Sequence, residues 1–112
     1  MTPRLVWESQ ADQSLYVAPS LETEGFIHCT AEPDMLEQVA NRFYREAPGS
    51  FIIVCIASER LEADLRWEEV DGHLFPHIYG PLNRSAIEAI VPFSRDLDQK
   101  FILPPELKAY TG

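Results

Sequence analysis

The chain has 112 residues and carries 18 acidic against 9 basic side chains, which gives a formal net charge of −9. This length fits one domain over residues 1–112. The acidic charge argues against nucleic acid as a partner, because that binding depends on neutralising phosphates. No segment approaches the roughly 20 apolar residues of a membrane span, and the first residues do not read as a signal peptide. We therefore expect a cytoplasmic domain with no membrane partner. A small nucleotide stays compatible, because a local pocket can oppose the overall charge.

The first part of the chain predicts two short strands around an irregular segment. Residues 5–7 are a short apolar run and are expected to form the first strand. Residues 8–24 are polar and irregular, and Pro19 is expected to break any helix there. Residues 25–29 are mostly apolar and begin with a glycine, which indicates a buried strand.

The clearest helix is expected over about residues 33–46. Thr30 precedes an acidic turn that contains Pro33, which is N-cap chemistry with proline in the first helical turn. The run Ala47-Pro48-Gly49 then ends the helix. Apolar residues recur at helical spacing on one face: Met35, Leu36, Val39, Ala40, Phe43 and Tyr44.

The middle of the chain predicts strands joined by hairpins. Residues 51–57 are a near-continuous apolar run, so we expect a central strand covered on both faces. Residues 65–70 alternate and predict a half-exposed strand, and Asp71-Gly72 is a strong hairpin turn signal. Residues 73–75 should return antiparallel, and residues 87–93 predict the last strand.

The tail from Ser94 is expected to wrap the surface, pinned by the apolar run Phe101, Ile102 and Leu103. Hairpins outnumber any strand–helix–strand units in this pattern. We therefore predict an α+β fold with one main helix and a mainly antiparallel sheet.

His28 is the first candidate functional residue. It lies at the end of a predicted buried strand, just before a predicted helix N-terminus. Free backbone N–H groups and the helix dipole make such a junction a natural anion site. His28 is therefore a candidate ligand-contacting imidazole. The alternative is a core histidine that hydrogen-bonds to the backbone.

A second candidate is the rigid, proline-bounded loop expected over residues 75–81. His77 and Tyr79 are two residues apart, so in an extended stretch their side chains point to the same side. The flanking prolines, Pro76 and Pro81, limit the freedom of the segment, which suits a fixed binding wall. The alternative is a structural turn whose rings pack on the core.

Trp67, Glu68 and Glu69 precede the predicted hairpin turn. Either glutamate is a candidate general base or ribose ligand if it faces the pocket. Strand alternation places Trp67 and Glu69 on one face and Glu68 on the other. The alternative for either glutamate is a solvated carboxylate.

The cysteines and histidines predict neither a disulfide nor a metal site. Cys29 and Cys55 lie in apolar segments, and two cysteines in a cytosolic chain are more often buried thiols than a bridge. His73 and His77 are separated by a proline-containing segment, so their spacing matches no compact ligand pattern. Cys29 as a nucleophile needs a nearby base, and His28 would point to the opposite face of a strand.

Four ordered segments resemble the motifs of a bacterial family called domain of unknown function 952. They are residues 25–30, residues 40–44, Trp67-Glu68 and residues 75–82. The run phenylalanine-proline-histidine-isoleucine-tyrosine-glycine in the last segment is the most specific of them. The resemblance covers roughly residues 5–93.

The resemblance implies an ADP-ribosyltransferase-like fold, because the family is grouped by fold with enzymes that bind NAD in the cleft of a split, mixed sheet. In the poly-ADP-ribose polymerase branch, a histidine in a tryptophan-histidine-glycine-threonine pattern contacts the adenosine ribose. By this likeness His28 takes the ribose role and Thr30 follows it. Cys29 replaces the glycine, which narrows backbone access to a ligand.

The resemblance leaves the remaining site residues open. Tyr16, Tyr44 and Tyr79 are all candidates for the tyrosine of that fold group, and Glu68 and Glu69 are both candidates for its glutamate. The family itself has no established activity to carry over.

The expected function is binding of NAD as a substrate, or of a related nucleotide, with transfer of ADP-ribose. Glu68, Glu69 and His77 are the catalytic candidates, because such a transfer needs a carboxylate near a developing positive charge. The ligand-binding candidates are His28, Thr30, Trp67 and Tyr79. The alternatives are a non-catalytic binding module that kept the cleft, and an interaction domain in which the proline-bounded segment is only scaffold.

Overall fold

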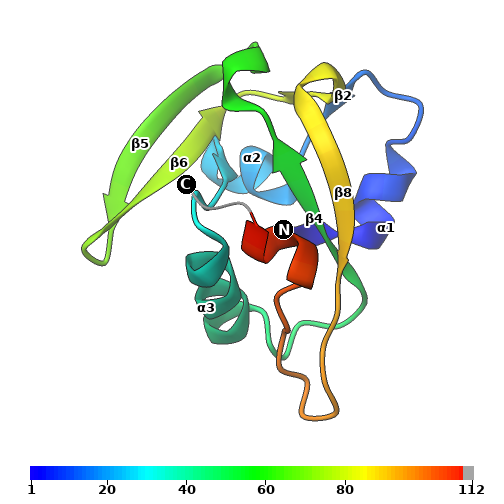
Figure 1. The fold of residues 1–112 in the computed structure, drawn as a ribbon. Helices are drawn as coiled ribbons and strands as arrows, with labels where there is room; N and C mark the ends of the chain where they lie inside the picture. The colour runs from blue at the N-terminus through cyan, green and yellow to red at the C-terminus, as the bar shows by residue number, and fades with distance from the viewer. Residues whose placement is uncertain (110–112) are drawn as a thin grey trace.

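The computed structural model describes residues 1–109, which fold into antiparallel sheets with a few short helices (Figure 1). The first sheet has the order β1 (Thr2–Pro3), β4 (Phe51–Ile56) and β8 (Ile87–Phe93). The second has the order β3 (Ile27–His28), β6 (His73–Tyr79) and β5 (Asp64–Val70). A third ladder joins β2 (Leu15–Tyr16) to β7 (Leu82–Asn83).

The α-helices are α1 (Arg4–Ser9), α2 (Pro19–Glu24) and α3 (Pro33–Phe43). Single 3₁₀ turns lie at Ser58–Arg60, Arg84–Ala86 and Pro105–Ala109. The α+β class and the mainly antiparallel pairing are confirmed. Every pairing between the strands within residues 1–109 is antiparallel, so the parallel pair that a mixed sheet requires is absent from this part of the chain.

Two predictions for the N-terminal part were wrong. Residues 5–7 lie in helix α1, and the neighbouring Thr2–Pro3 pairs with β4 instead. A run of three apolar residues cannot distinguish a strand from one helical turn, and Trp7 alone is buried in α1. Pro19 begins α2 rather than preventing it, because the first helical position needs no N–H donor. Gly25 ends α2 with a φ of 87°, which shortens the expected strand to β3.

The main helix is confirmed, but its ends differ from the prediction. Helix α3 ends at Phe43 rather than residue 46, and Tyr44 follows it as the C-cap. Its N-cap is Glu32, without a side-chain capping hydrogen bond, so Thr30 does not cap it. Leu36 and Ala40 are buried and anchor the helix to the core.

The hairpin of β5 and β6 is confirmed and is longer than expected. Asp71 and Gly72 have φ values of 52° and 82°, as a type I′ turn requires. Strand β6 continues through Pro76 to Tyr79, where a loop was expected. The Pro76 carbonyl accepts a hydrogen bond from the Cys29 N–H at 3.1 Å. The nitrogen of Pro76, which has no hydrogen to donate, points toward the same side, where β3 has already ended at His28. The pairing of β3 with β6 therefore loses little from the absent backbone hydrogen bond.

The central strand β4 is only half covered. Phe51, Ile52 and Ile53 are buried, whereas residues 54–56 are partly exposed. The prediction of cover on both faces therefore holds for the first half of this strand. The second half borders a hollow of about 440 Å³ between β4 and the inner face of the β5–β6 hairpin.

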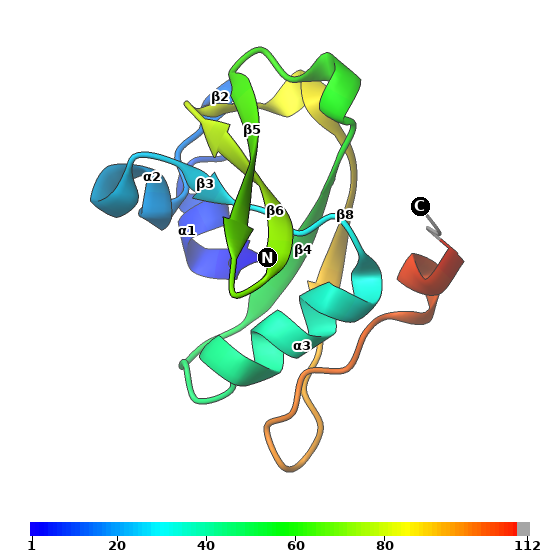
Figure 2. The same cartoon turned by 90° about the vertical axis from the view of Figure 1, so that its left-hand side faces the viewer.

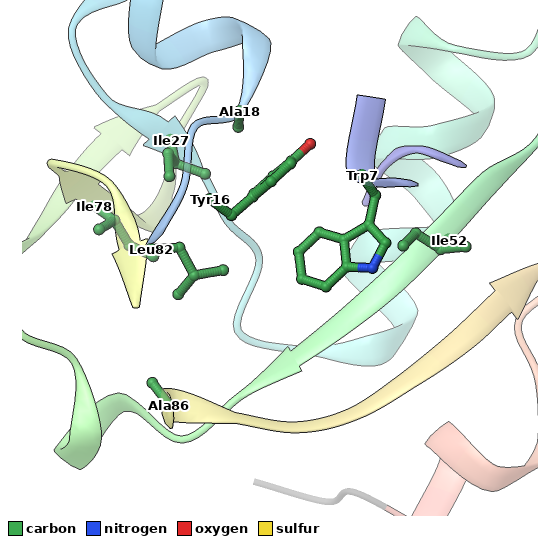
Figure 3. Close-up of a cluster of buried hydrophobic side chains, with 8 residues drawn as sticks. All are labelled: Trp7, Tyr16, Ala18, Ile27, Ile52, Ile78, Leu82 and Ala86. Carbon is green, nitrogen blue, oxygen red and sulfur yellow. The ribbon is translucent and has the colours of Figure 1, made fainter. Parts of the chain in front are cut away.

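The buried side chains form two clusters. Figure 3 shows the first, which fills the space between the β3–β6–β5 sheet, α1 and β4 and comprises Trp7, Tyr16, Ala18, Ile27, Ile52, Ile78, Leu82 and Ala86. The second joins α3 to the start of β4 and to the tail. In the tail, Phe101 and Leu103 are buried and Ile102 is 46% exposed, so the predicted pinning holds for the first two residues only.

Cys29 and Cys55 are free thiols. Both are partly buried. No helix within residues 1–109 is long and apolar enough to cross a membrane.

The tail is expected to be part of the folding unit. Phe101 is fully buried against Phe51 and Phe93, and both its backbone groups bond to the Asn41 side chain. Phe101→Ala should therefore lower the free energy of unfolding by about 3–5 kcal/mol, measured by urea denaturation. Ile102→Ala is the matched control and should cost less than about 1 kcal/mol. Equal losses in the two variants would contradict the assignment.

Candidate functional site

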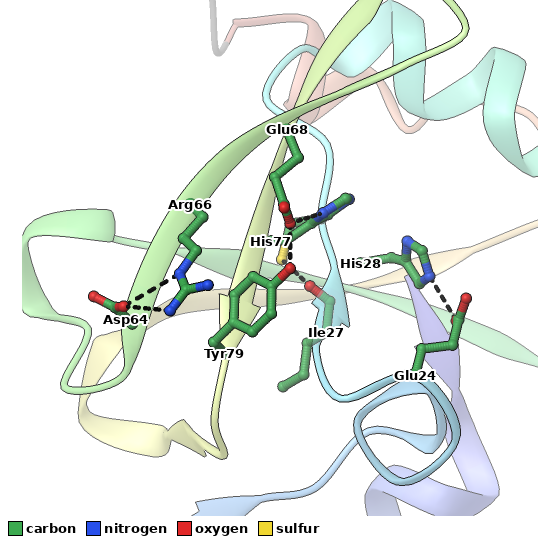
Figure 4. Close-up of polar contacts among 9 residues, drawn as sticks. Glu24, Ile27, His28, Asp64, Arg66, Glu68, His77 and Tyr79 are labelled. Carbon is green, nitrogen blue, oxygen red and sulfur yellow. Dashed lines mark hydrogen bonds and ion pairs between the residues drawn. The ribbon is translucent and has the colours of Figure 1, made fainter.

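The β3–β6–β5 sheet has one apolar face and one polar face. The register pairs Arg66 with His77 and Glu68 with Phe75, so the side chains of Glu68, His77 and Tyr79 share one face. Trp67 and Glu69 lie on the opposite face, as the alternation predicted. Among the predicted site residues, the structure therefore brings Glu68 together with His77 and Tyr79 (Figure 4). The strand register separates Trp67 and Glu69 from them.

Glu68 is the centre of the polar face. Its Oε1 atom accepts a hydrogen bond from the Tyr79 hydroxyl at 2.5 Å and one from the His77 Nδ1–H at 2.8 Å. These bonds, the Tyr79 bond first, lower the pKa of Glu68 below its ordinary value. The same bond raises the pKa of Tyr79. Glu68 is therefore an ionised carboxylate held in a fixed orientation, and its Oε2 atom has no hydrogen-bond partner among residues 1–109.

Arg66 supports this arrangement from the neighbouring position on β5. Its guanidinium lies 4.3 Å from the centre of the Tyr79 ring. The same group bonds to Asp64 at 3.3 Å, so two weak contacts hold an exposed cation beside the tyrosine.

His28 reaches the same face from β3. It pairs with His77 across the strands, and the two ring centres are 5.2 Å apart. The Nε2 atom of His28 lies 2.7 Å from Glu24 Oε2, at the end of α2. The side chain of His28 is 45% exposed, whereas that of His77 is 4% exposed. The alternative stated for His28, a core histidine bonded to backbone, does not describe it, because its imidazole is partly exposed and bonds to a carboxylate.

Phe26 joins the two histidines and was missed in the sequence. Its ring stacks on His77 with centres 4.3 Å apart, and it also contacts His28 at 4.8 Å and Tyr79 at 5.3 Å. The spacing of two residues between Phe26 and His28 was the available signal. Glu24 carried no such signal, because it lies in a helix that was not predicted.

A hollow of about 510 Å³ lies between this face and α3. Thr30, His28 and His77 are among the residues that line it, whereas Glu68 and Tyr79 are not. Arg42 of α3 lies 3.7 Å from Asp71 in the hairpin turn, which ties the helix to the hairpin. Figure 2 shows α3 running beside the end of the β5–β6 hairpin.

The other predicted candidates do not bond to Glu68, although Cys29 and Tyr44 line the hollow beside α3. Tyr16 is buried and bonds to Thr2, and Tyr44 packs in the second core, so Tyr79 is the tyrosine that meets Glu68. Burial raises the pKa of Cys29 to about 11, which keeps its thiol protonated and unsuited to nucleophilic attack. Within residues 1–109, no group of three or more His, Cys, Asp and Glu side chains is placed to hold a metal ion.

The predicted anion site at the start of α3 has few donors. Pro33 occupies the first helical turn and supplies no N–H group, and Glu32 brings a negative charge to the N-cap. A larger hollow of about 750 Å³ is lined by Arg95 among others and by none of Glu68, His77 and Tyr79. The Arg95 guanidinium already donates to the carbonyls of Arg45 and Gly49.

Comparison with known proteins identifies the family. The model of a family described as "Protein of unknown function (DUF952)" matches residues 1–90. The chain belongs to this family. No curated protein matches the chain.

Two solved structures resemble this DUF952 chain. The X-ray structure of Protein CC0527 from Caulobacter crescentus has a TM-score of 0.82 and 25% sequence identity, and the match covers 96% of this chain and 94% of that one. A double mutant of CC0527 gives a TM-score of 0.82 at 24% identity, with the same coverage of both chains. Neither structure comes with a named activity.

The Tyr79 hydroxyl is expected to set the ionisation of Glu68. Tyr79→Phe removes the first cause of the lowered pKa, so the pKa of Glu68 should rise toward 4.5, measured by NMR titration of the side-chain carboxyl carbon. The pKa of Glu68 is lower in the folded protein than in the unfolded chain, so ionised Glu68 stabilises the fold at pH values above the unfolded pKa. This stabilisation is lost as the pH falls through the pKa of the folded state. Tyr44→Phe is the control. An unchanged Glu68 titration in Tyr79→Phe would refute the assignment.

Proposed function

We propose that the polar face of the β3–β6–β5 sheet binds NAD or a related nucleotide, with Glu68 as the carboxylate that faces the reacting sugar. The observation that carries this proposal is the shared bonding of Glu68 to His77 and Tyr79, next to His28. An unpaired solvated glutamate would not be held in this way. The likeness to the ADP-ribosyltransferase fold is part of the proposal, and two separate sheets are compatible with a split sheet.

The chemistry of ADP-ribosyl transfer suits a fixed, ionised carboxylate. The bond between the ribose and nicotinamide breaks through a sugar that carries a developing positive charge, and a preorganised negative charge stabilises it. In Glu68, Oε1 is fixed by two donors and Oε2 has no partner within residues 1–109. His77 is a positioning residue in this scheme, because its ring nitrogen orients the carboxylate.

The hollow beside this face supports a ligand of nucleotide size. Its volume of about 510 Å³ lies within the roughly 300–1,000 Å³ typical of small-molecule sites. His28 and Thr30 line it and would contact the ribose. Phe26 adds an aromatic ring beside both histidines, on which a base or nicotinamide ring could stack.

A non-catalytic binding module is the second candidate. The stacking of Phe26 on His77, at an interplanar angle of 24°, favours it, because this contact covers one face of the imidazole. In such a module the face would hold a nucleotide, and Glu68 would accept a ribose hydroxyl without promoting bond cleavage.

Titration with NAD tests the proposal. NAD should shift the imidazole NMR signals of His28 and His77, and the protein should release nicotinamide. Glu68→Gln should keep the shifts and lower nicotinamide release by about 100-fold or more. Glu69→Gln is the matched control on the opposite face and should change neither. Shifts without nicotinamide release would select the binding module. Unshifted signals at millimolar NAD would refute nucleotide binding of this kind.

A further inference from the structure

We propose that His28 and His77 form a general acid–base pair that hydrolyses nucleoside 2′,3′-cyclic phosphates. This activity goes beyond ADP-ribose transfer and does not depend on NAD binding. It follows from the placement of two imidazoles on facing strands, each bonded to its own glutamate.

The two histidine–glutamate pairs leave one ring nitrogen of each histidine available. His77 uses Nδ1 for Glu68, which leaves Nε2. His28 uses Nε2 for Glu24, which leaves Nδ1. The ring centres are 5.2 Å apart, so one small group can contact both rings. A carboxylate behind an imidazole fixes the orientation and the tautomer of the ring, which suits proton transfer.

The unequal burial of the two rings assigns their roles. The His28 side chain is 45% exposed, so water can reach it and it can return protons to solvent. The His77 side chain is 4% exposed, so the attacking water reaches it less readily than His28, and His77 is placed at the leaving oxygen instead. His28 is therefore the base and His77 the acid.

The nucleophile in this reaction is water. Cys29 does not serve, because burial raises its pKa to about 11 and strand alternation points it to the other face. A reaction in which an attacking O–H loses a proton and a leaving oxygen gains one needs both a base and an acid. Hydrolysis of a phosphate ester fits this requirement.

The charge of the protein restricts the phosphate ester. With a net charge of −9, the chain repels polyanions such as RNA. A 2′,3′-cyclic phosphate carries a single negative charge, which one protonated imidazole can balance. Thr30 lines the same hollow, and its hydroxyl has no hydrogen-bond partner within residues 1–109, so it can donate to a phosphoryl oxygen.

The step balances without a co-reactant other than water. The water oxygen bonds to phosphorus, and its proton passes to Nδ1 of His28. The bond between phosphorus and the 2′ or 3′ oxygen breaks, and that oxygen takes a proton from Nε2 of His77. The product is a nucleoside 2′- or 3′-monophosphate, and proton exchange with solvent restores both imidazoles.

The experiment incubates the full chain with adenosine 2′,3′-cyclic phosphate and follows monophosphate formation by phosphorus NMR. His28→Gln and His77→Gln should each lower kcat by about 100-fold or more. Glu69→Gln is the matched control, because Glu69 is exposed on the opposite face of the sheet, and it should stay within about twofold of the parent. Glu24→Gln changes an exposed positioning residue, and it should lower kcat while KM stays unchanged.

Each outcome decides the proposal. No monophosphate from the parent chain, or undiminished rates in His28→Gln, would overturn it. His77 is buried, so if His77→Gln does not fold, the proposal is judged on His28→Gln together with the kcat of Glu24→Gln. NAD-induced shifts without cyclic phosphate hydrolysis would overturn this inference and leave NAD binding standing. Cyclic phosphate hydrolysis without NAD-induced shifts would support this inference and refute NAD binding.

Discussion

The register of the β5–β6 hairpin is the constraint on which the candidate site depends. The Asp71-Gly72 turn, with both residues at positive φ, fixes which residues face each other along the two strands. A slip of one residue would turn Glu68 to the apolar face and remove it from His77 and Tyr79. The apolar face makes such a slip costly, because Leu65 of the same strand would leave the first core cluster, against which it packs. Core packing and site geometry are therefore fixed by the same ladder.

The division of one sheet into two faces also explains how short strands hold a polar cluster. Strand β3 has two residues, yet it places Ile27 in the core and His28 on the polar face. Pro76 is tolerated in the middle strand because β3 has ended where its N–H would be needed. The chain then leaves β3 toward α3, and the hollow between α3 and the hairpin results from this departure.

The candidate site combines groups that differ in exposure. Glu68 and His77 form a pair with a nearly buried imidazole, whereas Glu24 and His28 form a pair open to solvent. Phe26 lies against both histidines and so links the two pairs. Membership in DUF952 and the likeness to CC0527 establish the family and the fold, and the polar face carries the chemical argument.

The sequence by itself determined the features that depend on local patterns. Side chains alternate between the two faces of a strand, and this placed Glu68 on the face opposite Trp67 and Glu69. The Asp71-Gly72 pair predicted the hairpin, and the helical spacing of apolar residues predicted α3. Local patterns failed where a short segment fits two structures, as in α1 and α2. Only the tertiary structure decided that His28 meets His77 and that Glu24 and Phe26 belong with them. The pairing of β3 with β6 joins segments about fifty residues apart, and the side-chain period of one strand contains no information about which other strand it will meet.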